Sequence, residues 1–163
     1  MKCCCFTGNR PARFPWGSDE SAPECERLKA HISAEVERLV CDGYGHFITG
    51  MAQGADTFCA EAVLSAKSRY PHITLECAVP CPEQTRGWDV NAVNRYKRIL
   101  DKADAVVTLS PHYTRGCMMK RNAYMVSRAD FVLAVWDGEK RGGTFNTLEK
   151  ARRDNKDMRI VSF

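Results

Sequence analysis

The strongest constraint on the fold is an alternation, repeated along the whole chain, of short continuous apolar segments with longer segments of helical periodicity. The apolar segments are KCCCFT (2–7), HFIT (46–49), ITLECAV (73–79), AVVTLS (105–110), FVLAVW (131–136) and RIVSF (159–163). Strands that are apolar on both sides are typical of a parallel sheet covered by helices on both faces. The sequence therefore predicts an α/β fold, a Rossmann-like three-layer sandwich with a mostly parallel central sheet.

The segments between the strands have the periodicity of helices. Apolar residues recur at Leu28, Ile32, Val36 and Leu39, and further helices are expected at 54–69, 91–102, 116–128 and 145–154. No stretch has the composition of a linker, so we expect one domain over residues 1–163. The segments KADAVVTLS and RADFVLAVW resemble each other, which we interpret as two strand–helix repeats of one architecture.

Composition and charge limit the classes of protein. No apolar run approaches the roughly 20 residues that span a membrane, and the N-terminal apolar stretch is too short for a signal peptide. We therefore expect a cytoplasmic protein without a membrane partner. The net charge is +4, and the basic residues are scattered among acids. This pattern favours small anionic molecules, and nucleic acid as a partner stays open but unsupported.

The nine cysteines predict buried thiols rather than a metal centre. Cys3, Cys4 and Cys5 alternate faces if they lie on a strand, so they cannot converge on one ion. Cys77 and Cys81 lack the Cys-x-x-Cys spacing of a zinc site, and no second pair follows. We expect reduced cysteines that pack as small apolar side chains, and no metal.

Glycine, hydroxyl and charged residues follow four of the predicted strands. The carboxyl ends of parallel strands share one edge of the sheet, and ligands bind there. The candidate ligand-binding residues after these strands are Thr7, Gly8, Arg10, Gly50, Gln53, Gly54, Asp56, Ser110, Gly142, Gly143, Thr144 and Thr147. Their convergence predicts a site that cradles phosphate.

Two of these loops have alternative explanations. In TGMAQGAD (49–56), glycines before a helix expose amide groups suited to phosphate, but they also suit an ordinary tight turn. Asp56 would repel a phosphate beside it, so we expect it to hold a ribose hydroxyl or Arg10. In GGTFNT (142–147), the threonines cap a helix or bind an anion. We expect Glu149 within about the first turn of that helix, where the helix dipole favours its charge.

The known nucleotide-cofactor motifs do not occur. No Gly-x-Gly-x-x-Gly follows the first strand, and no Gly-Lys-Ser/Thr phosphate loop is found. A Gly-x-Ser-x-Gly nucleophile elbow is also missing, and no histidine has an evident nucleophile as a partner. His112 alone follows a strand end. We therefore expect no cofactor.

Five motifs together resemble one family. CFTGNRP, TGMAQGAD, the CAVP segment with its Gln and Trp, GCMMKRNAYMV and WDGEKRGGTFNTLE look like the bacterial YpsA-like proteins, whose function is uncharacterised. These belong to the SLOG superfamily, which includes the DNA-processing Smf/DprA proteins and the LOG enzymes. The resemblance covers nearly the whole chain. The family usually has Thr-Gly-His-Arg in the first loop, where this chain has Asn9.

The stretch from 116 to 149 also resembles the LOG enzymes, which hydrolyse a nucleoside monophosphate to base and ribose phosphate. Their motifs are matched by Met118, Arg121, Met125, Ala129, Asp130, Gly142, Gly143, Thr147 and Glu149. The resemblance implies that Arg121 and Glu149 are catalytic, with Glu149 stabilising charge on the ribose or orienting water. Asn122 replaces the LOG lysine, and the glycine-rich loop is longer, so the phosphate site carries over better than the catalysis.

Three functions remain as hypotheses. The first is a nucleotide-binding protein, which needs only the converging loops. The second is a LOG-like hydrolase, which needs Arg121 and Glu149 at one cavity. The third is a nucleic-acid module like the Smf/DprA relatives, which needs a continuous basic face. Trp88 and Tyr113 would stack a base or pack the core, and Gln84 would read a base edge or cap a turn. The resemblance also leaves a homodimer open.

Overall fold

Six parallel strands form one sheet, in the order β4-β3-β2-β1-β5-β6, in the computed structural model, which describes residues 1–163. The strands are β1 (Lys2–Gly8), β2 (Tyr44–Thr49), β3 (Thr74–Val79), β4 (Ala105–Thr108), β5 (Phe131–Val135) and β6 (Asp157–Val161). The helices are α1 (Pro23–Cys41), α2 (Ala55–Ala66), α3 (Val90–Lys102), α4 (Cys117–Arg128) and α5 (Gly143–Arg153), with a short 3₁₀ helix at Pro11–Arg13. The predicted α/β Rossmann-like fold is confirmed.

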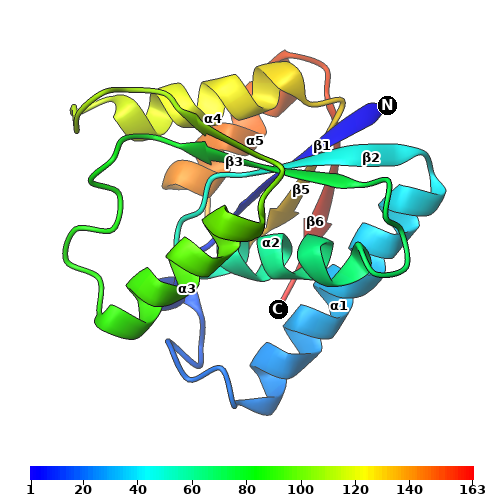
Figure 1. Ribbon diagram of the computed structural model, residues 1–163, viewed down its shortest axis with the longest axis horizontal. Coiled ribbons are helices and arrows are strands. Elements are labelled where there is room, and N and C mark those ends of the chain that lie inside the picture. Colours follow the sequence, from blue (N-terminus) through cyan, green and yellow to red (C-terminus); the bar gives the residue numbers. More distant parts are fainter.

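The helices form a layer on each face of the sheet. Helices α1, α2 and α3 cover one face, and α4 and α5 cover the other (Figure 1). The first face holds a core cluster of 26 buried residues, and the second a cluster of 9. Cys4 lies in the larger cluster, whereas Cys3 and Cys5 lie in the smaller one, as alternation along a strand requires. All nine cysteines are free, and only Cys41 is exposed.

Segments 102–110 and 128–136, which resemble each other in sequence, each contain an Ala-Asp pair. The two aspartates form the same kind of hydrogen bond. The Asp104 carboxylate accepts a hydrogen bond from Leu75 N at the start of β3, at 2.8 Å. The Asp130 carboxylate accepts one from Cys3 N at the start of β1, also at 2.8 Å. Each aspartate therefore anchors the first residues of its strand to the neighbouring strand.

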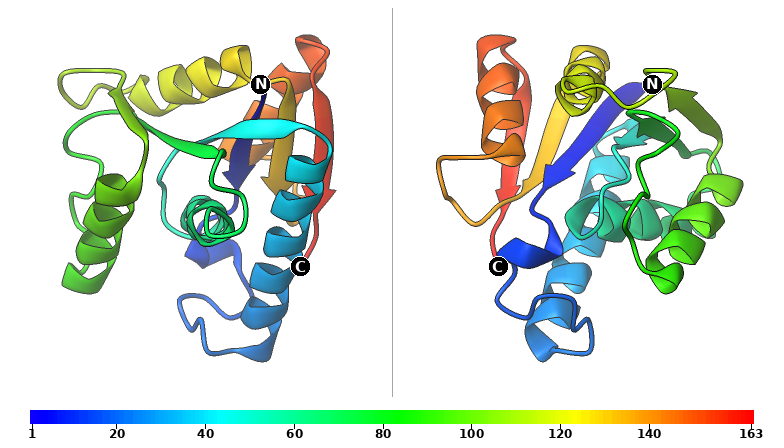
Figure 2. Two further views of the ribbon diagram at one scale, coloured as in Figure 1. Left: turned by 45° about the vertical axis from the view of Figure 1, so that its right-hand side comes forward. Right: turned by 90° about the vertical axis from the view of Figure 1, so that its left-hand side faces the viewer.

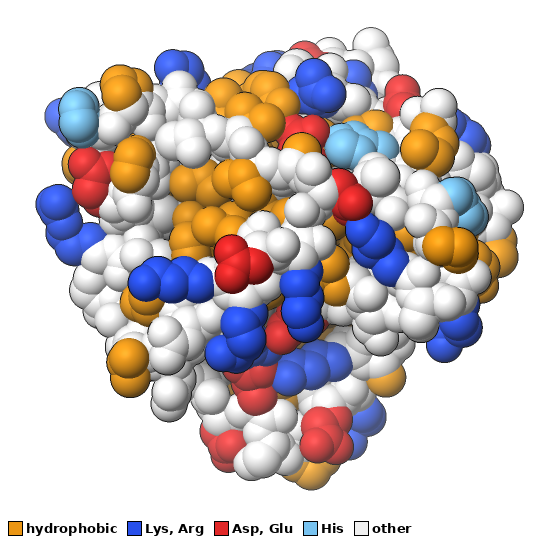
Figure 3. Space-filling model, in the orientation of Figure 1, with side chains coloured by type: hydrophobic (Ala, Val, Ile, Leu, Met, Phe, Trp, Pro, Cys, Tyr) orange, Lys and Arg blue, Asp and Glu red, His pale blue; other side chains and the backbone are white.

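Strand β4 differs from the expectation that the apolar strands are covered on both faces. It is an edge strand that pairs only with β3, and Val106 on it is 46% exposed. Apolar side chains gather on this side of the molecule, between α4 and α3 (Figure 3). An apolar segment thus indicated a strand correctly, but could not indicate whether that strand lies at the centre or the edge. No helix is both long enough and apolar enough to cross a membrane.

The strand order reverses next to β1. Strands β2, β3 and β4 follow on one side of β1, and α4 then returns the chain to β5 on the other side. Strands β1, β5 and β6 run side by side in the same direction (Figure 2). In an open parallel sheet, the loops at such a switch point diverge and leave a crevice at the carboxyl ends of the strands. Here that crevice lies beyond Gly8 and Val135.

Candidate functional site

A cavity of about 280 Å³ opens at the switch point. Its walls come from the end of β1, the start of α2, the middle of α4 and the start of α5. Of the predicted site residues, it is lined by Thr7, Gly8, Arg10, Asp56, Arg121, Gly143 and Thr144. We call it the switch-point cavity. It brings together residues that are far apart in the sequence, in the place where parallel sheets bind ligands.

Asp56 contributes a buried carboxylate to this cavity. Asp56 is 7% exposed, and its Oδ2 accepts one hydrogen bond, from Ala52 N at 3.2 Å. Burial raises the pKa of the Asp56 carboxyl, and the positive charges of Arg121 and Arg10 and the bond from Ala52 only partly oppose the rise. A carboxylate in this place accepts hydrogen bonds from hydroxyl groups and repels phosphate. The amide of Ala55 at the start of α2 is already bonded to Asn9 O.

Arg121 contributes a buried guanidinium. The residue is 3% exposed, and its Nη1 donates to the carbonyl oxygens of Gly50 and Ala78. Its Nε donates to Asn122 Oδ1 at 2.8 Å, and Nη2 has only Met118 Sδ, at 3.8 Å. No carboxylate forms an ion pair with it. Burial accordingly lowers the pKa of Arg121, although the nearby Asp56 charge opposes this.

Gly50 is what allows Arg121 to lie here. A Cβ on Gly50 would be 2.7 Å from Nη1 and 2.8 Å from Cζ of Arg121. Such contacts are shorter than packed atoms tolerate, so any larger residue at 50 displaces the guanidinium. The next residue, Met51, has a φ of 60°, which is uncommon for a residue other than glycine. The turn after β2 is therefore shaped around the arginine.

Asn9 is a site residue that the sequence did not single out. It is 4% exposed, and its Oδ1 accepts a hydrogen bond from Asp137 N at 2.8 Å, which joins the loops after β1 and β5. Its Nδ2 has no acceptor in the protein, and Asn9 lines the switch-point cavity. The one signal for it was its place, where the resembling family has histidine. Asn122 is a second such residue, since its Oδ1 orients Arg121 from within the cavity wall.

The N-terminus of α5 supplies backbone donors. The helix begins at Gly143, which lines the cavity together with Thr144. The first N–H groups of a helix have no partner within it and carry the positive end of the helix dipole. Thr144 is buried, and no hydrogen bond of its hydroxyl group is formed within the protein. The cavity is therefore richer in donors than in acceptors, as a site for an anion requires.

Several predicted residues lie elsewhere. Glu149 does not line this cavity; it is the seventh residue of α5, and its Oε1 pairs with Arg152 at 2.9 Å. Its expected place in about the first turn was wrong, because α5 begins two residues earlier than predicted. Thr147 donates to Gly143 O within α5, at 2.9 Å. Ser110 is buried outside the cavity, and Gly142 is the exposed residue that precedes α5.

His112 and Tyr113 are exposed in the loop before α4 and line none of the cavities described here. Gln84 is buried, and both ends of its amide are used: Nε2 donates to Gly50 O at 2.9 Å, and Oε1 accepts from Tyr96 at 3.2 Å. Gln84 therefore supports the turn that carries Gly50.

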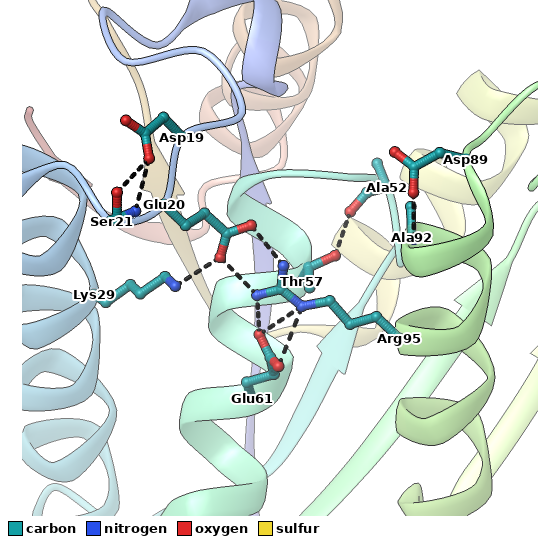
Figure 4. Close-up of polar contacts among 10 residues, drawn as sticks. All are labelled: Asp19, Glu20, Ser21, Lys29, Ala52, Thr57, Glu61, Asp89, Ala92 and Arg95. Carbon is teal, nitrogen blue, oxygen red and sulfur yellow. Dashed lines mark hydrogen bonds and ion pairs between the residues drawn. The ribbon is translucent and has the colours of Figure 1, made fainter.

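A second, larger cavity of about 430 Å³ lies between α2, α3 and the loop before α1. Gln53 and Gly54 line it, together with Trp88 and Tyr96, and we call it the aromatic hollow. Its central cation, Arg95, is neutralised: it bonds Glu20 at 2.6 Å and Glu61 at 2.5 Å (Figure 4). Burial alone would lower the pKa of Arg95, but these hydrogen bonds raise it above its ordinary value.

The sequence is similar to bacterial proteins over most of its length. It is 31% identical to the SPbeta prophage-derived protein YoqJ of Bacillus subtilis, over 80% of this chain and 84% of that protein. It is 28% identical to a UPF0398 protein of Bacillus thuringiensis, over 94% and 84% of the two chains. A UPF0398 protein of Halalkalibacterium halodurans is 27% identical, over 83% and 75%.

A solved structure shares the fold. The X-ray structure of TM1055 aligns with 97% of this chain and 72% of its own, with a TM-score of 0.59 and 14% sequence identity. The sequence profile of the YspA SLOG family matches residues 4–163, which include every residue of the switch-point cavity. The resemblance noted from the motifs is thereby confirmed, and the chain belongs to the YspA SLOG family.

Proposed function

We propose that the protein binds a nucleotide, or a ligand derived from one, with a phosphate group in the switch-point cavity. The observation that carries this proposal is Arg121, a buried guanidinium whose hydrogen bonds go to neutral oxygens rather than to a carboxylate. A buried charge to which no carboxylate is bonded is costly for a folded protein. A bound phosphate lowers that cost, because it adds a directly bonded negative charge to that of the nearby Asp56, which forms no ion pair with Arg121.

The other groups in the cavity suit the remainder of a ribose phosphate. The N–H groups at the start of α5, the exposed guanidinium of Arg10 and the Nδ2 of Asn9 are donors for phosphate oxygens. Asp56 is the one carboxylate that lines the cavity, and carboxylates accept hydrogen bonds from ribose hydroxyls. A phosphate, with a sugar beside it, matches this mixture better than a phosphate alone.

The test is a thermal-shift screen of wild-type protein and Arg121→Ala against ribose 5-phosphate, nucleoside mono-, di- and triphosphates, NAD and ADP-ribose. A ligand that binds only the folded state raises the melting temperature. We expect at least one of these compounds to stabilise the wild type and not the variant. Equal stabilisation of both proteins would refute the assignment to this cavity, and so would a lack of stabilisation by every compound.

Hydrolysis of the bound nucleotide is a second candidate, in a form different from the LOG pattern. Cleavage of the N-glycosidic bond adds water to C1′ of the ribose and releases the base, and a carboxylate close to the ribose assists it. The carboxylate that lines the cavity is Asp56, whose pKa is raised, and not Glu149. If AMP is hydrolysed, we expect Asp56→Asn to abolish the release of adenine and Glu149→Ala to retain it. The reverse result would support the LOG assignment.

A nucleic-acid function receives less support. On the face shown in Figure 3, Lys and Arg side chains are interleaved with Asp and Glu side chains, so this face carries no continuous basic stripe. Salt-sensitive retention of DNA by the protein, together with failure of all the small compounds, would favour that function instead.

A further inference from the structure

A third cavity, of about 240 Å³, adjoins both of those already described. It shares Arg10, Ala12 and Ala52 with the switch-point cavity. It shares Gln53 and Trp88 with the aromatic hollow. We call it the connecting cavity. A ligand anchored at Arg121 that extends past Arg10 therefore reaches a cavity lined by an aromatic side chain, and does not have to end at the ribose.

Trp88 provides a flat apolar surface along this path. It is partly exposed and contacts Tyr96 edge to face, with ring centroids 5.6 Å apart and an angle of 89° between the rings. This geometry occupies at most one face of the indole. An indole face that borders a cavity can stack against any of the nucleobases, because every base has a π-face.

Gln53 provides hydrogen-bonding groups beside Trp88. It is half-buried and lines both the connecting cavity and the aromatic hollow, and its side-chain amide has no hydrogen-bond partner in the protein. Gln84 also lines the connecting cavity, but its amide is bonded to Gly50 and Tyr96. Gln53 is therefore the glutamine that is free to bond the edge of a base.

The charges determine which end of a nucleotide lies in which cavity. Arg95 in the aromatic hollow is bonded to two carboxylates and has little attraction left for phosphate. Arg98 at its rim is exposed to solvent. Arg121 in the switch-point cavity is bonded to no carboxylate. The phosphate is thus favoured at the switch point, and the base is favoured towards Trp88.

We propose that the connecting cavity and the adjoining side of the aromatic hollow form a nucleobase subsite, with Trp88 as its stacking surface and Gln53 as the residue that selects the base. The proposal rests on the proposed function, since the phosphate in the switch-point cavity positions the base. The ligand is then a complete nucleotide, and neither free phosphate nor ribose phosphate fills the site.

Calorimetric titration of AMP and of ribose 5-phosphate into wild type, Trp88→Leu and Trp88→Phe tests the subsite. Loss of one stacking partner weakens binding by roughly 5- to 150-fold. We expect Trp88→Leu to lose that much affinity for AMP and none for ribose 5-phosphate. Trp88→Phe, which keeps an aromatic face, is the matched control and retains most of the affinity. Melting temperatures of both variants show that they are folded.

The outcomes separate this inference from the proposed function. If wild type binds AMP and ribose 5-phosphate equally, or if Trp88→Leu weakens both alike, the subsite does not exist, but the phosphate site stands. If neither compound binds wild type, the subsite proposal fails, and the proposed function fails with it only if every other compound of the thermal-shift screen also fails to bind. A preference for a 5′-phosphorylated oligonucleotide over AMP would overturn the assignment to a free nucleotide. For Gln53→Leu, we expect an altered ranking of AMP, GMP, CMP and UMP; an unchanged ranking contradicts the role of Gln53.

Discussion

The switch-point cavity and the aromatic hollow lie on either side of the turn after β2. They differ in whether their charged side chains are paired with one another. In the hollow, Arg95 is held between Glu20 and Glu61, and Lys29 also pairs with Glu20, at 2.6 Å (Figure 4). In the switch-point cavity, Asp56 and Arg121 are both buried, yet they form no ion pair with each other.

The difference is the one expected between a structural cluster and the binding site that we propose. The residues around Arg95 satisfy one another and join α3 to α2 and to the loop before α1, so they need no ligand. Asp56 and Arg121 are held apart by backbone groups, Ala52 N for the first and Gly50 O for the second. Charges kept buried and separate cost stability, and proteins retain such costs mainly at functional sites.

Replacing the arginine of the switch-point cavity has the largest expected effect. Arg121→Ala removes the charged donor that we propose for the phosphate, and hydrogen bonds of this kind contribute about 1.5–3 kcal/mol, or roughly 10- to 150-fold in affinity. We expect a loss of this size for ribose 5-phosphate, measured by calorimetry. Arg121→Lys keeps the charge without the planar fork and should give an intermediate loss. A variant that binds as wild type does would contradict the role of Arg121.

Gly50→Ala tests the same cavity without removing any functional group. Its added Cβ overlaps the guanidinium of Arg121, and a clash of this kind costs roughly 1–3 kcal/mol unless the side chain moves. We expect the arginine to move, and the affinity for ribose 5-phosphate to fall by roughly 10-fold. Gly87→Ala is a control, since a Cβ there meets no atom within 4 Å. The φ of Gly87 is 83°, which disfavours alanine, so this variant is strained in its backbone and not by a clash with Arg121. Equal affinities of the two variants would argue against this mechanism.

Arg95→Met applies the corresponding change to the aromatic hollow. It leaves Glu20 and Glu61 without their shared partner, and partly exposed ion pairs of this type contribute about 1 kcal/mol or less. We expect a small decrease in the free energy of unfolding, measured with urea, and unchanged affinity for ribose 5-phosphate. A large loss of phosphate affinity in Arg95→Met would show that the two cavities have been assigned the wrong way round.

The smallest expected effect concerns the cost of the Asp56 charge in the absence of ligand. Burial raises the pKa of Asp56 in the folded protein, so the folded state binds this proton more tightly than the unfolded chain does. The stability that Asp56 contributes is therefore full at acid pH and is lost as the pH rises through the raised pKa. The Asp56→Asn variant cannot ionise at this position, so it does not lose stability in this way as the pH rises.

We therefore expect Asp56→Asn to be more stable than wild type at about pH 8. The difference in stability should shrink as the pH falls towards about 4, the ordinary pKa of an aspartate. Urea unfolding at several pH values measures it, with Asp42→Asn, a change at an exposed aspartate, as the control. An advantage of Asp56→Asn that does not depend on pH would mean that the carboxylate carries no such cost.

Much of this arrangement could be predicted from the sequence, because it depends on local patterns. Continuous apolar segments indicated the strands, and glycines and hydroxyl residues after them indicated the loops at one sheet edge. The order of the strands could not be derived in this way, since pairing joins segments far apart in the chain. The exposed β4 was mispredicted as covered for this reason.

The side chains at the site were harder to predict than the loops. Glu149 was expected beside Arg121, but its direction depends on where α5 begins, and a difference of two residues turns a side chain through more than half a helical turn. Asn9 was missed because an asparagine after a strand is usual in turns. Apart from its place, where the resembling family has histidine, its partner Asp137 N and its position at the cavity indicate a role for it.

A crystal structure of the protein with AMP would locate the phosphate directly. We predict a phosphate group within about 3 Å of Arg121 Nη2 and of the first N–H groups of α5, with the ribose at Asp56. A phosphate bound at Arg95 or Arg98, with the switch-point cavity left unoccupied by the ligand, would contradict this prediction.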